Sequence, residues 1–304
     1  MSQPTCKTHA PAPAPRRWAR GLLVAALSLA AGATLADAGA LKQKFAQVQE
    51  PMRNNDMGRD LHIDSSESGD KLQGDVYAVL DHPYTEVRTA LKDPARWCDI
   101  LILPFNTKYC HAVDQADGPG LLVRIGRKYD QPLKNAYRLD FGYRNVAATA
   151  DYFESRLNAG DGPLGTRDYR IVLSAMPLPS GKTFVHLSYS YGYGVAGRLA
   201  MQGYLATVGA DKIGFTVTGR TPDGQPRYIG GVRGAVERNA MRYYLAIDSY
   251  LDSLAAPPAK QVEKRIQGWF TATERYPRQL REMDRPTYVG MKLSEVERQQ
   301  TMIR

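Results

Sequence analysis

The stretch "VYAVLDHPYTEVRTALKDPARWCDIL", residues 76–101, changes its periodicity twice, and these changes decide the fold. Its opening belongs to "GDVYAVLD" (74–81), which predicts a strand. Residues 82–93 predict a helix, because Pro83 suits a first turn and the apolar residues that follow fall on one face. A second short helix is expected to begin at Pro94. The order indicated is strand, helix, helix.

A long run of strand candidates follows this stretch. Breakers such as "ADGPG", "NAGDGPLG" and "PLPSGK" separate several of them, so short hairpin turns are expected. This spacing predicts a consecutive antiparallel meander, with a helical insertion over 196–212, a last strand over 213–219 and a loop over 221–231. The strand candidates are 107–114, 120–129, 135–146, 148–157, 167–176 and 183–194.

The clearest helix in the sequence spans residues 232–254. Its apolar residues recur at spacings of three and four and form one stripe, and most charged residues fall elsewhere around the helix. "AAPPAK" ends this helix, and residues 261–285 beyond it are charged and helix-prone, with a break at Pro277. The stripe is Val236, Ala240, Tyr243, Tyr244, Ile247, Leu251 and Leu254, and the charged residues are Arg233, Glu237, Arg238, Arg242, Asp248 and Asp252.

This order of elements resembles the helix-grip fold of the START lipid-transfer domains. The same fold occurs in the wider SRPBCC superfamily, which includes polyketide cyclases and coenzyme-Q-binding proteins. The resemblance rests on residues 76–101, where "LKDPARW" (91–97) lies at the end of that superfamily's first helix and at its following tryptophan, and on "GGVRGAVERNAMRYYL" (230–245). It implies an α+β fold in which a curved antiparallel sheet wraps a long C-terminal helix.

The resemblance also divides the chain. It covers roughly residues 72–255, so a START-like helix-grip domain is assigned to 72–256 and a helical or extended C-terminal tail to 257–304. Residues 39–71 are assigned to an N-terminal leader. A short amphipathic helix is expected over 40–52, and the polar residues 53–70 predict a loop.

The N-terminus has the three parts of a secretory signal peptide. "RRWAR" (16–20) is basic, an apolar run follows it, and Ala36-Asp37-Ala38 is a small-x-small cleavage site. The apolar run is short for a membrane span, although an uncleaved anchor is the alternative. We expect cleavage after Ala38 and a periplasmic or secreted protein, and the choice between Sec and twin-arginine export is left open.

The net charge bears on the partners of the chain. Removing residues 1–38 takes away four basic residues and one acidic residue, which lowers the net charge from +9 to about +6. The remaining positive residues are scattered among acids, whereas nucleic-acid binding needs a concentrated basic face. No nucleic-acid partner is therefore expected, and transient contact with an anionic membrane surface fits the charge better.

Two cysteines remain in the mature chain, Cys98 and Cys110. In an oxidising compartment such a pair is most simply a disulfide. Closing so short a loop stabilises the fold by about 3 kcal/mol in the entropic treatment of cross-links. Two buried free thiols are the alternative. Only His111 stands nearby as a further ligand, so a metal site is not expected here.

Two strands and the long helix concentrate tyrosine on faces that are predicted to turn inward. A sheet curved around a helix leaves room for a largely apolar pocket, and phenol hydroxyls in a dry core would need partners. An ordinary filled core is the alternative. The expected lining residues are Tyr137, Phe141, Tyr143, Leu187, Tyr189, Tyr191, Val236, Tyr243, Tyr244 and Ile247.

The apolar run inside "WCDILILPFNTKYC", residues 97–110, has two interpretations. The START resemblance places it beside one mouth of the pocket. A disulfide would then hold both ends of the run while its middle covers the opening as a gate. The alternative is that the run is buried core. The candidate gate residues are Leu101, Ile102, Leu103 and Phe105.

Candidate catalytic groups are few. No phosphate-binding or dinucleotide-binding motif occurs, and no histidine forms a metal-binding pair by its spacing, so no metal and no cofactor are expected. The histidines of the mature chain are His62, His82, His111 and His186. Two charged pairs on neighbouring strands either face solvent as a ladder, which is favoured, or face the pocket. They are Glu154 with Arg156 and Asp168 with Arg170.

Two functions are compatible with these features. The first is an exported, non-catalytic protein that carries or senses one hydrophobic small molecule, lipid-like or polyaromatic, in the pocket. The alternative is a cyclase-like or hydrolase-like enzyme that uses Tyr and Arg side chains in the same pocket. In the tail, Trp269, Phe270 and Tyr276 either contact a membrane or partner or pack back on the domain. The ligand and the oligomeric state are left open.

Overall fold

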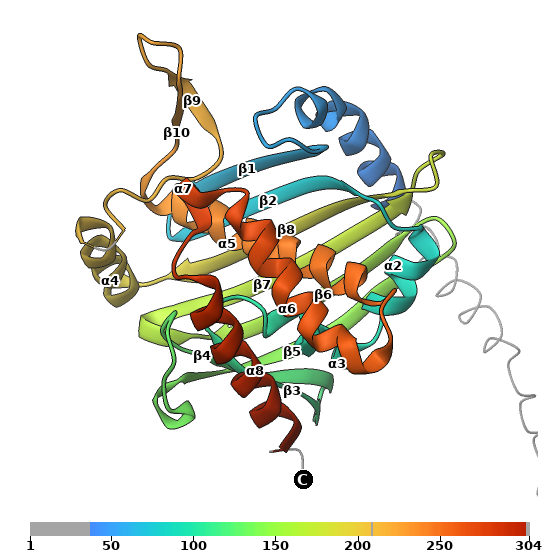
Figure 1. The fold of residues 1–304 in the computed structure, drawn as a ribbon. Helices are drawn as coiled ribbons and strands as arrows, with labels where there is room; N and C mark the ends of the chain where they lie inside the picture. Colours follow the sequence, from blue (N-terminus) through green and yellow to red (C-terminus); the bar gives the residue numbers. More distant parts are fainter. Residues whose placement is uncertain (1–36, 208, 302–304) are drawn as a thin grey trace, which may run out of the picture.

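The computed structural model describes residues 37–207 and 209–301, and Figure 1 shows their arrangement. The predicted signal peptide, residues 1–38, falls almost entirely outside the described residues. The described part contains a large antiparallel sheet, the helices that cover its concave face, and one N-terminal helix on the opposite face (Figure 1).

Eight strands form one antiparallel sheet in the order β1-β2-β8-β7-β6-β5-β4-β3. Strands β3 to β8 are consecutive neighbours, so the predicted meander is confirmed. Strand β6 begins later than predicted, because residues 149–152 form the preceding turn. The strands are β1 (Leu61–Ser68), β2 (Lys71–Leu80), β3 (Thr107–Gln115), β4 (Gly118–Ile125), β5 (Tyr137–Ala148), β6 (Phe153–Asp161), β7 (Thr166–Pro177) and β8 (Thr183–Tyr193).

The long helix α5 (Gly231–Ser253) lies across the concave face of the sheet, and this confirms the α+β class and the helix-grip arrangement (Figure 1). The two short helices of the opening stretch are α2 (Tyr84–Leu91) and α3 (Pro94–Leu101). The Asp93 side chain accepts a hydrogen bond from the Ala95 amide at 2.9 Å and starts α3. Short 3-10 turns lie at Leu133–Asn135 and Pro163–Gly165.

The C-terminal tail packs on the domain as three helices, α6 (Pro258–Glu274), α7 (Pro277–Leu280) and α8 (Arg285–Thr301). Trp269, Phe270 and Tyr276 are buried, because they pack on α5 and neighbouring elements. Their burial matches the alternative in which these residues pack back on the domain. Among the described residues, no helix combines the length and the apolar character that crossing a membrane requires.

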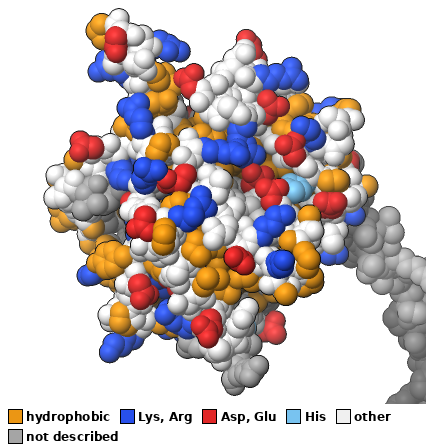
Figure 2. Space-filling model, in the orientation of Figure 1, with side chains coloured by type: hydrophobic (Ala, Val, Ile, Leu, Met, Phe, Trp, Pro, Cys, Tyr) orange, Lys and Arg blue, Asp and Glu red, His pale blue; other side chains and the backbone are white. Residues whose placement is uncertain are grey.

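Charges are mixed over the face that the tail helices form. Figure 2 shows Lys and Arg side chains interspersed with Asp and Glu across this face, without a broad patch of one sign. This distribution differs from the concentrated basic face typical of nucleic-acid-binding proteins.

The first strand corrects the predicted loop over residues 53–70. Residues 61–68, "LHIDSSES", form β1 and pair along their whole length with β2. Leu61, Ile63 and Ser65 are buried on the concave face, where the period of two places them. The sheet therefore begins ahead of the domain boundary expected at residue 72.

Residues 37–53 are helical and pack on the convex face of the sheet. The Phe45 and Phe184 rings lie 4.8 Å apart between this helix and β8. Glu154 projects from β6 on the same face, where it is buried and accepts hydrogen bonds from Tyr152 and Arg156. Glu154 and Arg156 of β6 thus point away from the pocket side of the sheet, as the favoured interpretation expected. Glu154 is nevertheless buried and not exposed to solvent.

The insertion between β8 and α5 contains a helix and a separate hairpin. Helix α4 (Val195–Ala206) confirms the predicted helical insertion. The expected last strand of the main sheet is wrong, because β9 (Val217–Arg220) pairs only with β10 (Pro226–Tyr228) in a two-stranded sheet of its own. The predicted loop over 221–231 accordingly holds β10. This hairpin projects from the body of the molecule (Figure 1).

Candidate functional site

A partly enclosed cavity of about 570 Å³ lies between α5, the concave face of the sheet and α4. This volume falls within the range of sites for small-molecule ligands, roughly 300–1,000 Å³. The lining residues are Leu101, Phe105, Asn106, Thr107, Val123, Ile125, Gly126, Arg127, Lys128, Leu139, Phe141, Pro163, Leu164, Thr166, Tyr169, Ile171, Tyr189, Tyr191, Gly197, Ala200, Met201, Ala235, Arg238, Asn239, Arg242 and Tyr243.

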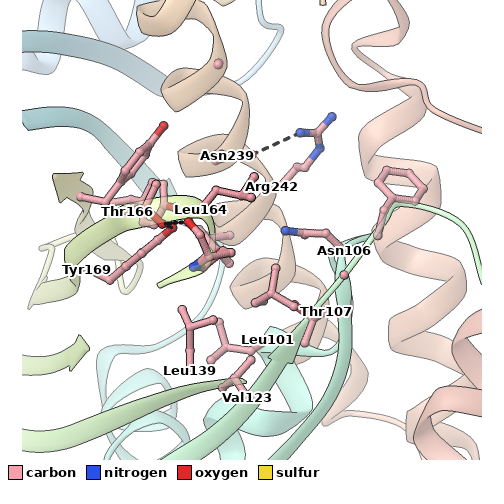
Figure 3. Close-up of a pocket in the computed structure, with 18 of the residues that line it drawn as sticks. Leu101, Asn106, Thr107, Val123, Leu139, Leu164, Thr166, Tyr169, Asn239 and Arg242 are labelled. Carbon is pink, nitrogen blue, oxygen red and sulfur yellow. Dashed lines mark hydrogen bonds between the residues drawn. The ribbon is translucent and has the colours of Figure 1, made fainter. Parts of the chain in front are cut away.

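One part of the cavity wall is apolar. Figure 3 shows Leu101, Val123 and Leu139 gathered on one side of the pocket, from α3, β4 and β5. Leu139 and Val123 are direct partners in the register of β4 and β5, so their side chains share one face of the sheet. Phe141 extends the same row along β5. This wall can bury an apolar ligand surface but offers it no hydrogen bond.

Four tyrosines form a second part of the wall. The Tyr189 ring lies 5.7 Å from Tyr191 on β8 and 5.1 Å from Tyr243 on α5, and Tyr169 stacks on Tyr191 at 5.4 Å. The Tyr169 hydroxyl donates to Thr166 Oγ1 at 2.8 Å. The cluster brings phenol groups of two strands and α5 into one corner of the cavity.

The hydroxyls of Tyr189, Tyr191 and Tyr243 have no hydrogen-bond partner among the described residues. Their oxygen atoms are not completely buried, so they are not unsatisfied core atoms. Burial raises the pKa of all three phenols well above the ordinary value, so they remain protonated at physiological pH. Each phenol is therefore a neutral hydrogen-bond donor in the cavity wall.

A third part of the cavity wall is polar and basic. Arg238 and Arg242 project from successive turns of α5, and both are buried. Arg242 Nη1 donates to Asn239 Oδ1 at 3.4 Å, the contact drawn as a dashed line in Figure 3. Arg238 Nη1 donates to the Ile213 carbonyl at 3.1 Å. Lys128, in the segment after β4, lines the same region of the cavity.

Glu282, between α7 and α8, is the acidic partner of this basic region. Its carboxylate lies 2.6 Å from both Lys128 Nζ and Arg242 Nη2 and 3.6 Å from Lys212 Nζ. Burial alone would raise the pKa of Glu282, but the charges of Arg242 and Lys128 outweigh burial and hold the pKa below its usual value. Burial lowers the pKa of Lys128 to about 8, with Arg242 acting in the same direction.

The predicted lining residues fall into three groups. Phe141, Tyr189, Tyr191 and Tyr243 line the cavity. A second group is buried in the core outside the cavity, namely Tyr143, Leu187, Val236, Tyr244 and Ile247. Tyr143 is satisfied there, because its hydroxyl donates to the Leu91 carbonyl at 3.0 Å. Tyr137 forms the third group, because it is 50% exposed at the start of β5 and is not among the residues that line the cavity.

The candidate gate residues lie inside the molecule. Leu101, Ile102, Leu103 and Phe105 are all buried, and Leu101 and Phe105 line the cavity. Helix α8 covers the segment, since Tyr288 donates to the Leu103 carbonyl at 2.9 Å and Lys292 donates to the Pro104 carbonyl at 2.7 Å. This position matches the core interpretation of the run, and the segment cannot swing outward unless α8 moves.

Cys98 and Cys110 form the predicted disulfide, with a Cα–Cα distance of 5.1 Å. The bond joins α3 to β3, and both cysteines are buried next to the cavity wall. A structural disulfide of this kind is typical of oxidising compartments.

Replacing both cysteines tests the energetic role of this bond. The Cys98→Ala/Cys110→Ala double variant should lower the free energy of unfolding by about 3 kcal/mol, because the unfolded chain regains the freedom that the closed loop removes. Urea unfolding followed by circular dichroism measures the change. The wild-type protein under reducing conditions is the matched control and should unfold at a similarly lowered midpoint. Equal midpoints for variant and oxidised wild type would contradict the prediction.

Catalytic side chains are scarce around the cavity. Among the described residues that line it there is no His, Cys, Asp or Glu. His186 lies on the convex face, where Nε2 is 2.8 Å from Asp75 Oδ1. Within the described ranges, no group of three potential His, Cys, Asp or Glu ligands gathers to hold a metal ion.

A second, larger hollow of about 860 Å³ lies between α2, α3, α5 and α6. Its walls carry many charged and polar side chains, including His82, Glu86, Lys92, Asp93 and Arg96. Such a groove is readily hydrated, so it is a weaker candidate for a small-molecule site than the apolar cavity under α5.

No protein-family model matches the chain, and no curated protein matches it significantly. Similar solved structures include Ara h 8.0201, at 11% identity over 64% of this chain and 99% of that chain with a TM-score of 0.33. Human StAR-related lipid transfer protein 5 is 12% identical over 59% of this chain and 90% of its own, with a TM-score of 0.30.

The lipid transfer and protein localization domain of human StarD13 is 7% identical over 47% of this chain and 76% of its own, with a TM-score of 0.31. START domains, the group that the sequence resembles, are thus among the matched structures. At TM-scores of this size the likeness establishes neither membership of a family nor a shared ligand. The fold described above follows from the chain's own sheet order and from α5.

Proposed function

We propose that this protein binds one hydrophobic small molecule in the cavity under α5 and acts as a carrier or sensor. The observation that supports this most directly is the cavity itself, which combines an apolar wall with phenol hydroxyls that have no partner among the described residues. In a filled core, those hydroxyls would need protein partners. A ligand with an apolar body and a few polar atoms would satisfy both parts of the wall.

The driving force would be burial of apolar ligand surface. A ligand that buries about 400 Å² of apolar area gains about 10 kcal/mol before the costs of association are subtracted. The tyrosine hydroxyls would add orientation more than affinity, because hydrogen bonds to a ligand replace hydrogen bonds to water.

A binding role is favoured over catalysis by the composition of the wall. The described lining residues supply Tyr, Arg and Lys side chains but no carboxylate, imidazole or thiol. Proton donors are thus present, while among these residues the side chain best suited to act as a general base is Lys128, and its ammonium is paired with Glu282. The cyclase-like or hydrolase-like alternative would need a phenol to lose its proton, which burial opposes, or Lys128 to lose the proton that its ion pair with Glu282 stabilises.

We also propose that the protein works outside the cytoplasm. The signal-peptide pattern of residues 1–38 and the disulfide of the described domain both point to a periplasmic or secreted location. Fractionation of the native host, with immunodetection of the processed chain, tests this proposal. A chain that stays in the cytoplasm with an intact N-terminus would overturn it.

Filling the cavity should abolish binding without removing the fold. Val123 lies on the inner face of β4, so Val123→Trp places an indole in the apolar part of the cavity. We expect at least a tenfold loss of affinity for N-phenyl-1-naphthylamine, an uncharged probe that fluoresces in apolar surroundings. Fluorescence titration of the delipidated protein measures the affinity.

Val172→Trp is the matched control, because Val172 follows the cavity residue Ile171 on β7 and turns to the convex face. It should bind the probe as wild type does. Overpacking the core can destabilise a fold, so Ala200→Phe on α4 provides a second route to fill the cavity. Unchanged probe affinity in folded forms of both cavity variants, or no probe binding by wild type, would refute the proposed function.

A further inference from the structure

The walls of the cavity carry charge of one sign. Among the described lining residues, four are cationic, Arg127, Lys128, Arg238 and Arg242, and none is acidic. Two of the four, Arg238 and Arg242, are buried side chains of α5. Because the wall around them is largely apolar, their charge acts in a medium that screens poorly, so an opposite charge placed inside the cavity would be strongly favoured.

Arg242 is positioned at one end of the cavity by contacts on three sides. It lies 5.9 Å from the centre of the Phe105 ring, 3.4 Å from Asn239 Oδ1 and 2.6 Å from the Glu282 carboxylate. A planar guanidinium held in this way can present N–H groups in a fixed direction, which suits recognition of a carboxylate or phosphate. Phe105, Asn239 and Arg242 all line the cavity.

Glu282 shows that the basic region accepts a carboxylate. Three cationic groups, from Lys128, Arg242 and Lys212, surround this single acidic side chain, so the group of four retains net positive charge. Glu282 itself comes from the segment between α7 and α8 and is not a lining residue. Its carboxylate thus meets from outside the same cations that a ligand would meet from inside the cavity.

We infer that the ligand of this cavity is an amphiphile whose anionic head group, a carboxylate or a phosphate, binds at Arg242 and Lys128 while its apolar body lies along β4 and β5. The inference rests on the proposed function and specifies the ligand class for the same site. Glu282 shares the two cations with the head group and so weakens its binding. A cationic amphiphile is repelled by the same wall, and an uncharged one gains only the apolar contacts.

The first test uses wild-type protein and ligands that differ only in the head group. Dodecanoate, dodecyl phosphate and dodecan-1-ol compete with N-phenyl-1-naphthylamine in a fluorescence displacement assay at low ionic strength. We expect dodecanoate or dodecyl phosphate to bind about tenfold or more tightly than dodecan-1-ol, because a hydrogen bond to a charged group exceeds a neutral one. The stronger of the two anions distinguishes a carboxylate from a phosphate head.

Two variants test the residues. Arg242→Gln should remove most of the preference for the anionic ligands, measured as the ratio of anion affinity to dodecan-1-ol affinity within the same variant. Glu282→Gln should increase the preference several-fold, because it removes the competing carboxylate while keeping the side-chain volume. Arg138→Gln, at an exposed ion pair on β5, and Glu274→Gln, at the Arg281 ion pair on α6, are matched controls with no expected effect.

The results separate this inference from the proposed function. Equal affinities of wild type for the alcohol and both anions would overturn the inference and leave hydrophobic binding in place. Failure of all three ligands and of the probe to bind would overturn both. Should Arg242→Gln not fold, Glu282→Gln decides alone, and an unchanged or reduced preference for anions in that variant would contradict the competition described here.

Discussion

A chain that ends after Ala256 should not give a folded protein. The truncation keeps the whole domain that sequence resemblance assigns to 72–256 but removes α6, α7 and α8. Those helices contribute side chains that are fully or almost fully buried against the rest of the molecule. Five of them are Ile266, Trp269, Phe270, Leu280 and Tyr288. The tail is therefore part of the main core.

The size of the loss follows from the buried area. Each of these side chains is worth about 1.5–3 kcal/mol when it is buried. Five together reach the whole free energy of unfolding of an ordinary domain, about 5–15 kcal/mol. The cut also uncovers Phe105 and removes Glu295, the carboxylate that pairs with the buried Lys108. Circular dichroism and thermal unfolding of the purified fragment measure the outcome.

A deletion of exposed structure is the control for this truncation. Replacing residues 218–227 of the β9–β10 hairpin by a short Gly-Ser linker removes strands that are mainly exposed. That variant should retain the wild-type unfolding midpoint within a few degrees. A fragment 1–256 that unfolds cooperatively near the wild-type temperature would show that the tail helices are dispensable, contrary to their burial.

Much of the fold was predictable because local periodicity and packing agree. The meander from β3 to β8 and the helix at α5 follow alternation and three-to-four spacing, which depend only on neighbouring residues. Strand β1 was missed because Ser65 and the residues after it are polar, although Leu61 and Ile63 keep the inward period. Ser65 is buried there because its hydroxyl donates to Glu237 at 2.6 Å. That partner lies 172 residues away, beyond any local signal.

The basic side of the cavity was not predictable from the pattern of the long helix. Arg238 and Arg242 fall outside its apolar stripe, and a charged helix face usually indicates solvent. In the structure α5 has no broad solvent face, since the sheet covers one side and α6 covers another. Charged residues on such a helix must be buried with partners, as Arg242 is with Glu282. Only the position of the tail reveals this.

The tyrosines of β5 show the same limit of prediction from sequence at the level of single residues. Alternation predicted an inward face for Tyr137 as well as for Phe141 and Tyr143. Tyr137 is nevertheless half exposed at the start of its strand, and Tyr143 finds a backbone acceptor outside the cavity. Periodicity gives the side of a strand on which a residue lies. It does not give the depth of cover, which depends on elements far away in the chain.

Replacing Glu295 on α8 should destabilise the protein by about 3–5 kcal/mol, the cost typical of removing one partner of a buried ion pair. Glu295 lies 2.9 Å from Lys108 Nζ and 2.7 Å from Lys292 Nζ, and all three side chains are fully buried. Burial already lowers the pKa of Lys292 to about 8, although Glu295 opposes the shift. Glu295→Gln keeps the shape but leaves two buried ammonium groups with mainly backbone carbonyls as acceptors.

The pH dependence gives this prediction a second readout. Without the carboxylate, the pKa of Lys292 in the folded state should fall further below its unfolded value of about 10.5. Between those two values the unfolded chain binds more protons, so the free energy of unfolding rises with pH. The deficit of Glu295→Gln against wild type should therefore shrink between pH 7 and pH 9.5 in urea unfolding. Glu297→Gln, exposed on the same helix, should match wild type throughout. A Glu295→Gln protein as stable as that control at pH 7 would mean that the two lysines do not depend on the shared carboxylate.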